Sequence, residues 1–278
     1  MSAPQPHLFT EDDLGRISDF LYRWTGMIFG KKKNYYIERR LADRMKRTGL
    51  PGIRDYLARL AMDEEERQQL INAVTINETY FYREDHQLAA LCNAILPDVV
   101  RNRQGGDLIR IWSLPCSTGE EGYSIAIWLL ENWPLVDTYH IEIIGSDIDT
   151  HAITAARDGY YGTRALARLP APLCDAYFEP ELRHRRRIIQ DLRESVLFSQ
   201  CNLIDARSVA AAGKFDVILC RNLLIYFDED ARRAAAANLY DALNPGGYLC
   251  LGHSESMARI DDRFTLVRLD DAIVYRRD

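Results

Sequence analysis

Residues 108–130, LIRIWSLPCSTGEEGYSIAIWLL, decide the fold class of this chain. They begin with a short apolar run at 108–112, pass through a turn, and continue into an apolar stretch from Tyr123 to Leu130. A strand followed by a helix is the unit from which parallel sheets are built. The turn also carries two adjacent glutamates, so the same stretch places polar side chains just beyond the end of a strand.

The alternation of strands and helices continues to the end of the chain. Further strands are expected at 141–144, 196–198, 215–219 and 248–251, helices at about 150–157 and 229–243, and a closing hairpin at 264–269 and 272–275. This order predicts an α/β fold with a doubly wound, mostly parallel sheet and an antiparallel edge. Residues 159–195 do not fit the alternation. There we expect a small antiparallel β insertion at about 176–200, with Ile188-Ile189 paired to 196–198.

The first third of the chain is predicted to be helical. Apolar residues recur at three- and four-residue steps from Leu14 to Ile28, through Ile17, Leu21 and Trp24, and Thr10 with Asp13 offers a capping box before them. Three further amphipathic stretches follow, at 37–45, 53–60 and 70–74. The expected organisation is a helical N-terminal domain at 1–76, a linker at 77–90 that contributes to the ligand site, and an α/β domain at 91–278.

Composition excludes several classes of protein. Apolar residues make up 47% of the 278 residues and charged residues 27%, which is typical of globular proteins and excludes disordered or collagen-like chains. No run approaches the roughly 18 apolar residues that a membrane helix needs, and the first ten residues lack a secretion signal. The six widely spaced cysteines form no CxxC pair, so we expect reduced thiols, no metal site and a cytoplasmic location.

The net charge of −6 conceals a strongly basic segment. Residues 31–47 hold eight basic residues against Glu38 and Asp43, so this segment sums to +6 and the rest of the chain to −12. An acidic body with one basic face favours a specific acidic partner over nucleic acid, which usually binds a basic domain. A solvated helix face without a partner is the alternative.

Polar residues follow the predicted strands at the edge where open α/β sheets bind ligands. Glu120 and Glu121 open the helix after the first strand, where they would repel a phosphate, and the chain contains no GxGxxG. Asp147 ends the second strand, and a carboxylate there typically accepts hydrogen bonds from ribose hydroxyls. A ribose site without a phosphate cradle favours a positively charged nucleoside, S-adenosylmethionine, over NAD. The alternatives are a capping box, of Ser117 with Glu120 or of Thr118 with Glu121, and a helix cap at Asp147.

Two later strand ends complete this edge. Asn202-Leu203 follows the third strand, and a polar–apolar pair there suits the edge and the face of an adenine, although a simple turn fits equally well. The fourth strand runs into CRNLLIYF at 220–227, which places further polar side chains beside the same edge.

Five segments in order resemble the CheR-type methyltransferases, which esterify glutamate side chains of bacterial chemotaxis receptors. They are NETYFYR at 77–83, STGEEGYSIA at 117–126, SDID at 146–149, CRNLLIYF at 220–227 and GHSE at 252–255. The resemblance covers nearly the whole chain and implies a class I, Rossmann-like methyltransferase fold. It also implies a protein-glutamate O-methyltransferase of sensory adaptation, with S-adenosylmethionine as methyl donor, S-adenosylhomocysteine as product and no metal.

The resemblance implies roles for residues at the matched positions. Asn77, Thr79 and Arg83 resemble the segment between the domains that covers the methionine end of the cofactor. Arg83 and Tyr226 resemble the residues nearest the point of methyl transfer. The remaining implied cofactor contacts are Glu121, Asp147, Asn202, Leu203, Arg221 and Asn222.

The implied partner is the cytoplasmic helical bundle of methyl-accepting chemotaxis receptors. Because receptor methylation regions are rich in glutamate, a basic helix face with Arg39, Arg40, Arg44 and Arg47 is expected to dock on them. Some family members grip a receptor tether peptide with a glycine-containing loop in the β insertion. Residues 173–198 contain no glycine, so we expect methylation without a tether. We further expect a monomer that binds no nucleic acid and inserts in no membrane.

Methylation of a carboxylate needs no general base, because a glutamate is already ionised at neutral pH. Positioning and exclusion of water would then drive the reaction, with Arg83 and Tyr226 orienting the carboxylate. A surface ion pair of Arg83 with Glu84 or Asp85, and a core position for Tyr226, are the alternatives. His253 is expected to be a core histidine without chemistry. The alternative function is a non-catalytic, S-adenosylmethionine-binding adaptor or sensor in chemotaxis signalling.

Overall fold

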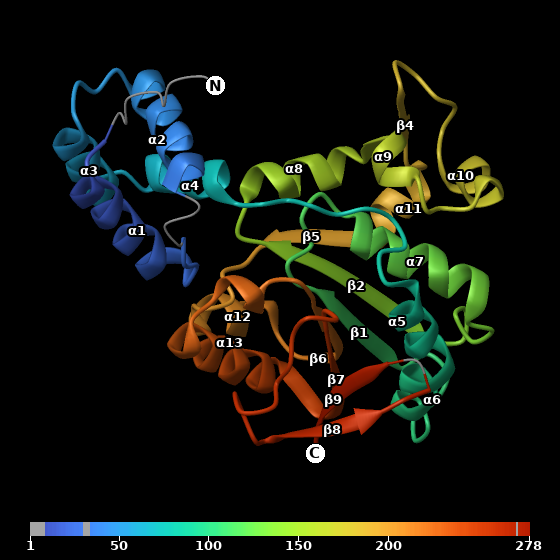
Figure 1. Cartoon of the computed structure of the whole chain (residues 1–278). Coiled ribbons are helices and arrows are strands. Elements are labelled where there is room, and N and C mark those ends of the chain that lie inside the picture. Colours follow the sequence, from blue (N-terminus) through green and yellow to red (C-terminus); the bar gives the residue numbers. More distant parts are fainter. Residues whose placement is uncertain (1–8, 30–33, 271) are drawn as a thin grey trace, which may run out of the picture. The chain divides into compact units, whose positions relative to one another are not determined.

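The computed structural model describes residues 9–29, 34–270 and 272–278. The chain divides into two compact units, one of residues 1–76 with 226–231 and one of residues 77–225 with 232–278 (Figure 1). Across the described ranges, no helix combines the length and the apolar character that a membrane crossing requires.

The smaller unit is helical in its described residues, as predicted. Its helices are α1 (Glu11–Thr25), α2 (Asn34–Thr48), α3 (Ile53–Met62) and α4 (Glu64–Val74). The expected capping box begins α1, where the Thr10 hydroxyl accepts from the Asp13 N–H and the Asp13 carboxylate accepts from the Thr10 N–H, both at 3.1 Å. Gly26 adopts a φ of 70°, in the left-handed region, and ends the helix. Local capping chemistry therefore sets both ends of α1.

A buried charge cluster joins three helices of this unit. Glu66 of α4 is only 4% exposed. Its carboxylate accepts two hydrogen bonds from Arg44 of α2, at 3.0 and 2.6 Å, and one from the hydroxyl of Tyr56 of α3 at 2.7 Å. Burial, followed by the hydrogen bond to Glu66, raises the pKa of Tyr56 far above its ordinary value. Because a buried charge is tolerated only when it is paired, the cluster ties α2, α3 and α4 together.

The larger unit contains a seven-stranded sheet in the order β5-β2-β1-β6-β7-β9-β8. The strands are β1 (Leu108–Ser113), β2 (His140–Asp147), β5 (Val196–Gln200), β6 (Phe215–Cys220), β7 (Leu243–Leu251), β8 (Phe264–Arg268) and β9 (Ile273–Arg277). The first five pair in parallel, and β9 pairs antiparallel with β7 and β8. The α/β class, the mostly parallel sheet and the closing hairpin are thus confirmed. The order reverses between β1 and β6, which is where such sheets bind ligands.

Helices cover both faces of the sheet. Figure 1 shows α12 and α13 on one face, and α5, α6 and α7 on the other. The bounds are α5 (Asp85–Ala90), a π-helical turn η2 (Leu91–Ile95), α6 (Leu96–Val99), α7 (Glu120–Asn132), α8 (Thr150–Asp158), α12 (Ala206–Ala212) and α13 (Glu229–Ala242). All six residues of β6 are buried, as expected for a central strand covered on both sides. The stretch from α5 to α6 was not predicted from the sequence, although Leu88, Leu91 and Ile95 are buried at helical spacing.

The predicted antiparallel insertion exists, but its pairing was wrong. Its two-stranded sheet joins β3 (Tyr160–Gly162) to β4 (Arg185–Arg187). Residues 196–198, predicted to pair with Ile188-Ile189, instead belong to the edge strand β5 beside β2, because Val196 and Phe198 bury their side chains in the main core. Ile188 makes only a single bridge, to Phe178. Short helices complete the insertion: α9 (Thr163–Leu166), α10 (Ala171–Tyr177) and α11 (Gln190–Ser195).

Candidate active site

Asp147 lies at the carboxyl end of β2 and is buried. Its carboxylate accepts from the N–H of Ser117 at 2.8 Å and from the N–H of Asp149 at 2.9 Å. Burial raises the pKa of Asp147 to about 6, and these backbone hydrogen bonds oppose that rise. The backbone of Ile148 opposes the rise as well. A contact between Asp147 and a ribose stays a prediction.

Asn77 connects the loops that follow β1 and β2. Its Nδ2 donates to Asp149 at 2.7 Å, and its Oδ1 accepts from the Ser117 hydroxyl at 3.3 Å. Asp149 also caps α8 through the backbone N–H groups of His151 and Ala152. The segment that begins at Asn77 is thus attached to the strand ends, and Thr79, in the same segment, is half-buried.

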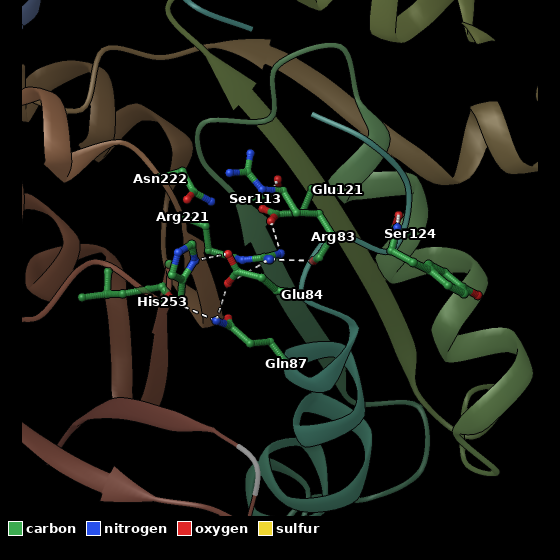
Figure 2. Close-up of polar contacts among 12 residues, drawn as sticks. Arg83, Glu84, Gln87, Ser113, Glu121, Ser124, Arg221, Asn222 and His253 are labelled. Carbon is green, nitrogen blue, oxygen red and sulfur yellow. Dashed lines mark hydrogen bonds and ion pairs between the residues drawn. The ribbon is translucent and has the colours of Figure 1, made fainter. Parts of the chain in front are cut away.

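Arg221 lies at the centre of a polar network beyond the ends of β1 and β6 (Figure 2). Its Nη1 donates to Glu121 at 2.6 Å. Its Nη2 donates to the carbonyl oxygen of Arg83 at 2.6 Å and lies 3.2 Å from the carboxylate of Glu84. The hydroxyl of Ser113, the last residue of β1, donates to the other oxygen of Glu121 at 2.8 Å. Two predicted cofactor residues, Glu121 and Arg221, are thus brought into direct contact.

Glu84 extends this network to the surface. Its Oε1 lies 2.8 Å from Nδ1 of His253, and its Oε2 accepts from the side-chain amide of Gln87 at 3.0 Å. The side chain of His253 is 67% exposed, so the prediction of a core histidine was wrong. Burial tends to raise the pKa of Glu84, but the hydrogen bond from His253 and the charge of Arg221 outweigh it and hold the pKa below its ordinary value.

Buried carboxylates exceed buried cations at this edge. Glu84, Glu121 and Asp147 are mostly or fully buried, and Arg221 pairs with the first two of them. Burial raises the pKa of Glu121, while Arg221 and Ser113 oppose the rise. The Nε of Arg221 is buried without a hydrogen-bond partner. Surplus negative charge and a polar atom without a partner suit a cationic ligand with acceptor groups, which describes S-adenosylmethionine with its sulfonium, ammonium and carboxylate.

The turn after β6 is held by the GHSE segment after β7. Asn222 adopts a φ of 60°, and its N–H donates to the Glu255 carboxylate at 2.7 Å. The N–H of Gly252 donates to the same oxygen at 2.9 Å. A Cβ at Gly252 would lie 3.0 Å from the backbone nitrogen of Asn222, so glycine permits the close approach of these two turns.

The adenine-side pair lies after β5. Asn202 is half-buried, and its N–H donates to the Ser208 hydroxyl at 3.0 Å. Leu203 is buried, and its carbonyl accepts from the Asn238 side chain at 2.7 Å. The loop is therefore well anchored in the fold, and the adenine contact of this pair stays a prediction.

Comparison with known proteins identifies the family. The model described as "CheR methyltransferase, all-alpha domain" matches residues 12–75, and the model described as "CheR methyltransferase, SAM binding domain" matches residues 77–273. The chain belongs to the CheR methyltransferase family. Chemotaxis protein methyltransferase 2 of Vibrio cholerae is 45% identical over 270 residues, which cover 96% of this chain and 93% of that protein. Chemotaxis protein methyltransferase 2 of Pseudomonas aeruginosa is 35% identical over 273 residues, with 96% and 93% covered.

Membership of the CheR family confirms the resemblance of the five segments. The chain is an S-adenosylmethionine-dependent chemotaxis protein methyltransferase, and its cofactor-binding domain corresponds to the larger unit. The cofactor contacts of Glu121, Asp147 and Arg221 stay predictions.

The two predicted catalytic residues of this CheR protein lie in different units. Arg83 belongs to the larger unit, where its guanidinium donates to the carbonyl oxygen of Glu78 at 2.7 Å. The alternative for Arg83 was an ion pair with Glu84 or Asp85. The structure instead pairs the guanidinium with the carbonyl oxygen of Glu78. Tyr226 ends the 3-10 turn η3 (Leu224–Tyr226) and groups with the smaller unit. The catalytic roles of Arg83 and Tyr226 stay predictions.

The predicted docking arginines of α2 fall into two groups. Arg39, Arg40 and Arg47 are exposed. Arg44 is only 12% exposed and donates two hydrogen bonds to Glu66. The prediction that Arg44 docks on the receptor was therefore wrong. Lys31, Lys32 and Lys33 lie outside the described residues.

Sequence reasoning missed Glu84, Gln87 and Ser113. Glu84 directly follows the NETYFYR segment and precedes the apolar stretch that begins at Leu88. This position is the one local signal that could have identified Glu84 as a site residue. Its partner Arg221 lies 137 positions further along the chain, so the contact is invisible to local patterns.

Proposed function

We propose that this CheR protein methylates glutamate side-chain carboxylates of methyl-accepting chemotaxis receptors, producing methyl esters and S-adenosylhomocysteine. The observation that carries the proposal is the buried, acidic ligand edge built from Glu121, Asp147 and Arg221 in a chain of this family. The bound cofactor supplies a methyl group activated by its sulfonium. The acceptor glutamate is already ionised at neutral pH, so no residue of the chain has to remove a proton.

The chain's own contribution is position and exclusion of water. Arg83 can donate hydrogen bonds to one oxygen of the acceptor carboxylate, and Tyr226 can donate one from its hydroxyl. Tight pairing with Arg83 would weaken the carboxylate as a nucleophile, so these contacts orient it rather than neutralise it. Near-attack alignment in a site without water contributes several kcal/mol in comparable reactions.

The proposed receptor surface is the exposed face of α2 with Arg39, Arg40 and Arg47. Glutamate-rich receptor helices are its complement in charge, and such complementarity accelerates encounter. The partner is the cytoplasmic helical bundle of the receptor, and the enzyme acts there as a monomer. Docking through α2 needs no tether peptide. The β insertion supports this independence, because Arg183 and His184, and no glycine, occupy the left-handed turn before β4.

The decisive experiment incubates the protein with methyl-labelled S-adenosylmethionine and receptor membranes, followed by mass spectrometry of the receptor. We expect base-labile methyl groups on glutamates of the cytoplasmic bundle. Arg83→Ala should transfer little label, because it removes a proposed hydrogen-bond donor to the acceptor carboxylate. Binding of the cofactor without any transfer by the wild-type protein would contradict the proposal and support the adaptor function.

A further inference from the structure

The turn that carries Arg83 has a disfavoured backbone. Tyr82 and Glu84 have φ values of 59° and 55°, in the left-handed region that residues with a Cβ rarely adopt. Such conformations persist only where surrounding contacts enforce them. On one side of the turn, the N–H of Tyr82 donates to the Ser124 hydroxyl at 3.1 Å, and the Tyr82 ring packs on Trp128 with 5.0 Å between centroids. Helix α7 therefore holds the first half of the turn.

Glu84 holds the second half. Its carboxylate contacts Arg221, Gln87 and His253 (Figure 2). The Nη2 of Arg221 reaches both the Glu84 carboxylate and the carbonyl oxygen of Arg83, at 3.2 and 2.6 Å. One nitrogen at the end of β6 thus binds the backbone of residue 83 and the side chain of residue 84. Any movement of Glu84 therefore shifts the attachment of Arg83 as well.

The contacts of Glu84 run from the surface to the cofactor edge. The exposed fraction of the side chain falls from 67% at His253 to 12% at Glu84 and 4% at Arg221. Arg221 in turn contacts Glu121, which faces the ligand edge. Because an ionised carboxylate only accepts hydrogen bonds, Nδ1 of His253 is the donor in this contact. The imidazole occupies one oxygen of Glu84 and leaves the other to Arg221 and Gln87.

We propose that Glu84 and His253 are positioning residues, which lock the strained turn and so hold Arg83 in place for methyl transfer. Neither residue needs to touch the substrate, since both act through the backbone of residues 82–84. Without His253, the carboxylate of Glu84 can rotate away from Arg221, and the turn can relax to an ordinary conformation. The inference rests on the proposed catalytic role of Arg83.

The test compares His253→Ala, His253→Asn, His253→Gln and Glu84→Gln with His140→Ala, which removes an exposed histidine at the opposite end of β2. Asparagine places its amide nitrogen near the position of Nδ1, whereas glutamine places it near Nε2. We expect His253→Ala and His253→Gln to lower kcat about fivefold and His253→Asn to restore most of it, as for one charged hydrogen bond. For Glu84→Gln we expect a loss on the order of 30-fold, because small displacements of catalytic groups are costly.

Two further readouts separate positioning from stability. In His253→Ala, the melting temperature should stay at the wild-type value, because the removed side chain is exposed, and kcat should fall more than the affinity for S-adenosylmethionine. Amide hydrogen exchange in a peptide covering residues 81–88 should become faster in His253→Ala, and His140→Ala should leave it unchanged.

Normal kcat and normal exchange in His253→Ala and Glu84→Gln would overturn the inference while receptor methylation by the wild-type protein still stands. Equal losses in His253→Ala and His253→Asn would also overturn it, since the donor position would then be irrelevant. If the wild-type protein methylates no receptor glutamate, the proposed function fails. The exchange measurement then decides by itself whether Glu84 and His253 lock the turn.

Discussion

Arg221 and Glu121 form an ion pair of 2.6 Å that joins the end of β6 to the first turn of α7. Both side chains are largely buried, so each depends on the other for compensation of its charge. The Nε of Arg221 is buried without a hydrogen-bond partner, and we predict that both residues contact the cofactor. Cofactor affinity should therefore respond to either residue.

Glu121→Gln should weaken binding of S-adenosylmethionine about 10- to 100-fold, because it removes a buried negative charge that faces a cationic ligand. Isothermal titration calorimetry measures the effect. Glu194→Gln, on the exposed face of α11, is the control and should bind normally. Wild-type affinity in Glu121→Gln would remove this residue from the cofactor site.

Binding of S-adenosylmethionine should strengthen as the pH rises from about 5 to about 7. The pKa of Asp147 is raised to about 6 in the ligand-free protein. Below that pH the carboxyl is protonated and has lost its negative charge, and above it the carboxylate attracts the cationic ligand. Calorimetry across this range should give a flatter profile for Asp147→Asn. An identical profile for the two proteins would assign the pH dependence to another group.

Asp147 should have the opposite effect on the stability of the ligand-free protein. A carboxyl whose folded pKa lies above its unfolded value binds more protons when folded, so its contribution to stability falls as the pH rises from about 4 to about 6. Urea unfolding of the wild-type protein and of Asp147→Asn over this range measures the difference. A wild-type stability that rises more steeply with pH than that of Asp147→Asn would contradict the sign.

Glu66→Ala should destabilise the helical unit by about 3–5 kcal/mol, because it leaves the buried guanidinium of Arg44 without its partner. Tyr56→Phe removes one hydrogen bond to the same carboxylate and should cost about 1–2 kcal/mol. Urea unfolding measures both. Arg59→Ala, which breaks an exposed pair with Asp63, is the control and should leave stability nearly unchanged. A similar result for Glu66→Ala and Arg59→Ala would contradict the role of the cluster.

Reversal of Arg39, Arg40 and Arg47 to glutamate should raise the KM for receptor about tenfold and leave cofactor affinity unchanged, since each surface charge contributes modestly to docking. The control reverses the exposed residues Arg101, Arg207 and Arg268 of the larger unit, which changes the net charge equally. Arg44 is omitted because its reversal would break the pair with Glu66. Equal KM values in the two triple variants would show that the exposed face of α2 is an ordinary solvated helix face without a docking role.

A receptor C-terminal pentapeptide should show no measurable binding in calorimetry, and receptors with and without such a tether should be methylated at similar rates. The reason is the β insertion, where residues 173–198 contain no glycine and Arg183 and His184 form the left-handed turn before β4. Tight binding of the pentapeptide would overturn the prediction of tether independence.

Most of the secondary structure follows from local patterns. The strand and helix expected in residues 108–130 correspond to β1 and α7, because apolar periodicity and polar turn residues act over a few positions. Local patterns were less informative where a segment had two possible partners. Residues 196–200 carry an apolar alternation that suits either a hairpin or a parallel edge strand. They form the parallel edge strand, because the backbone groups along the free edge of β2 pair with them.

The sequence by itself determined the fold class, the cofactor and the enzyme family, because motifs and periodicity are local properties of the chain. Only the tertiary structure decided that Arg44 is committed to Glu66, that His253 lies on the surface, and that Arg221 holds Arg83 and Glu84. Those contacts join residues 22 to 169 positions apart. Which polar groups meet over such separations depends on how strands and helices pack, since a buried charge must find its partner wherever the fold brings one near.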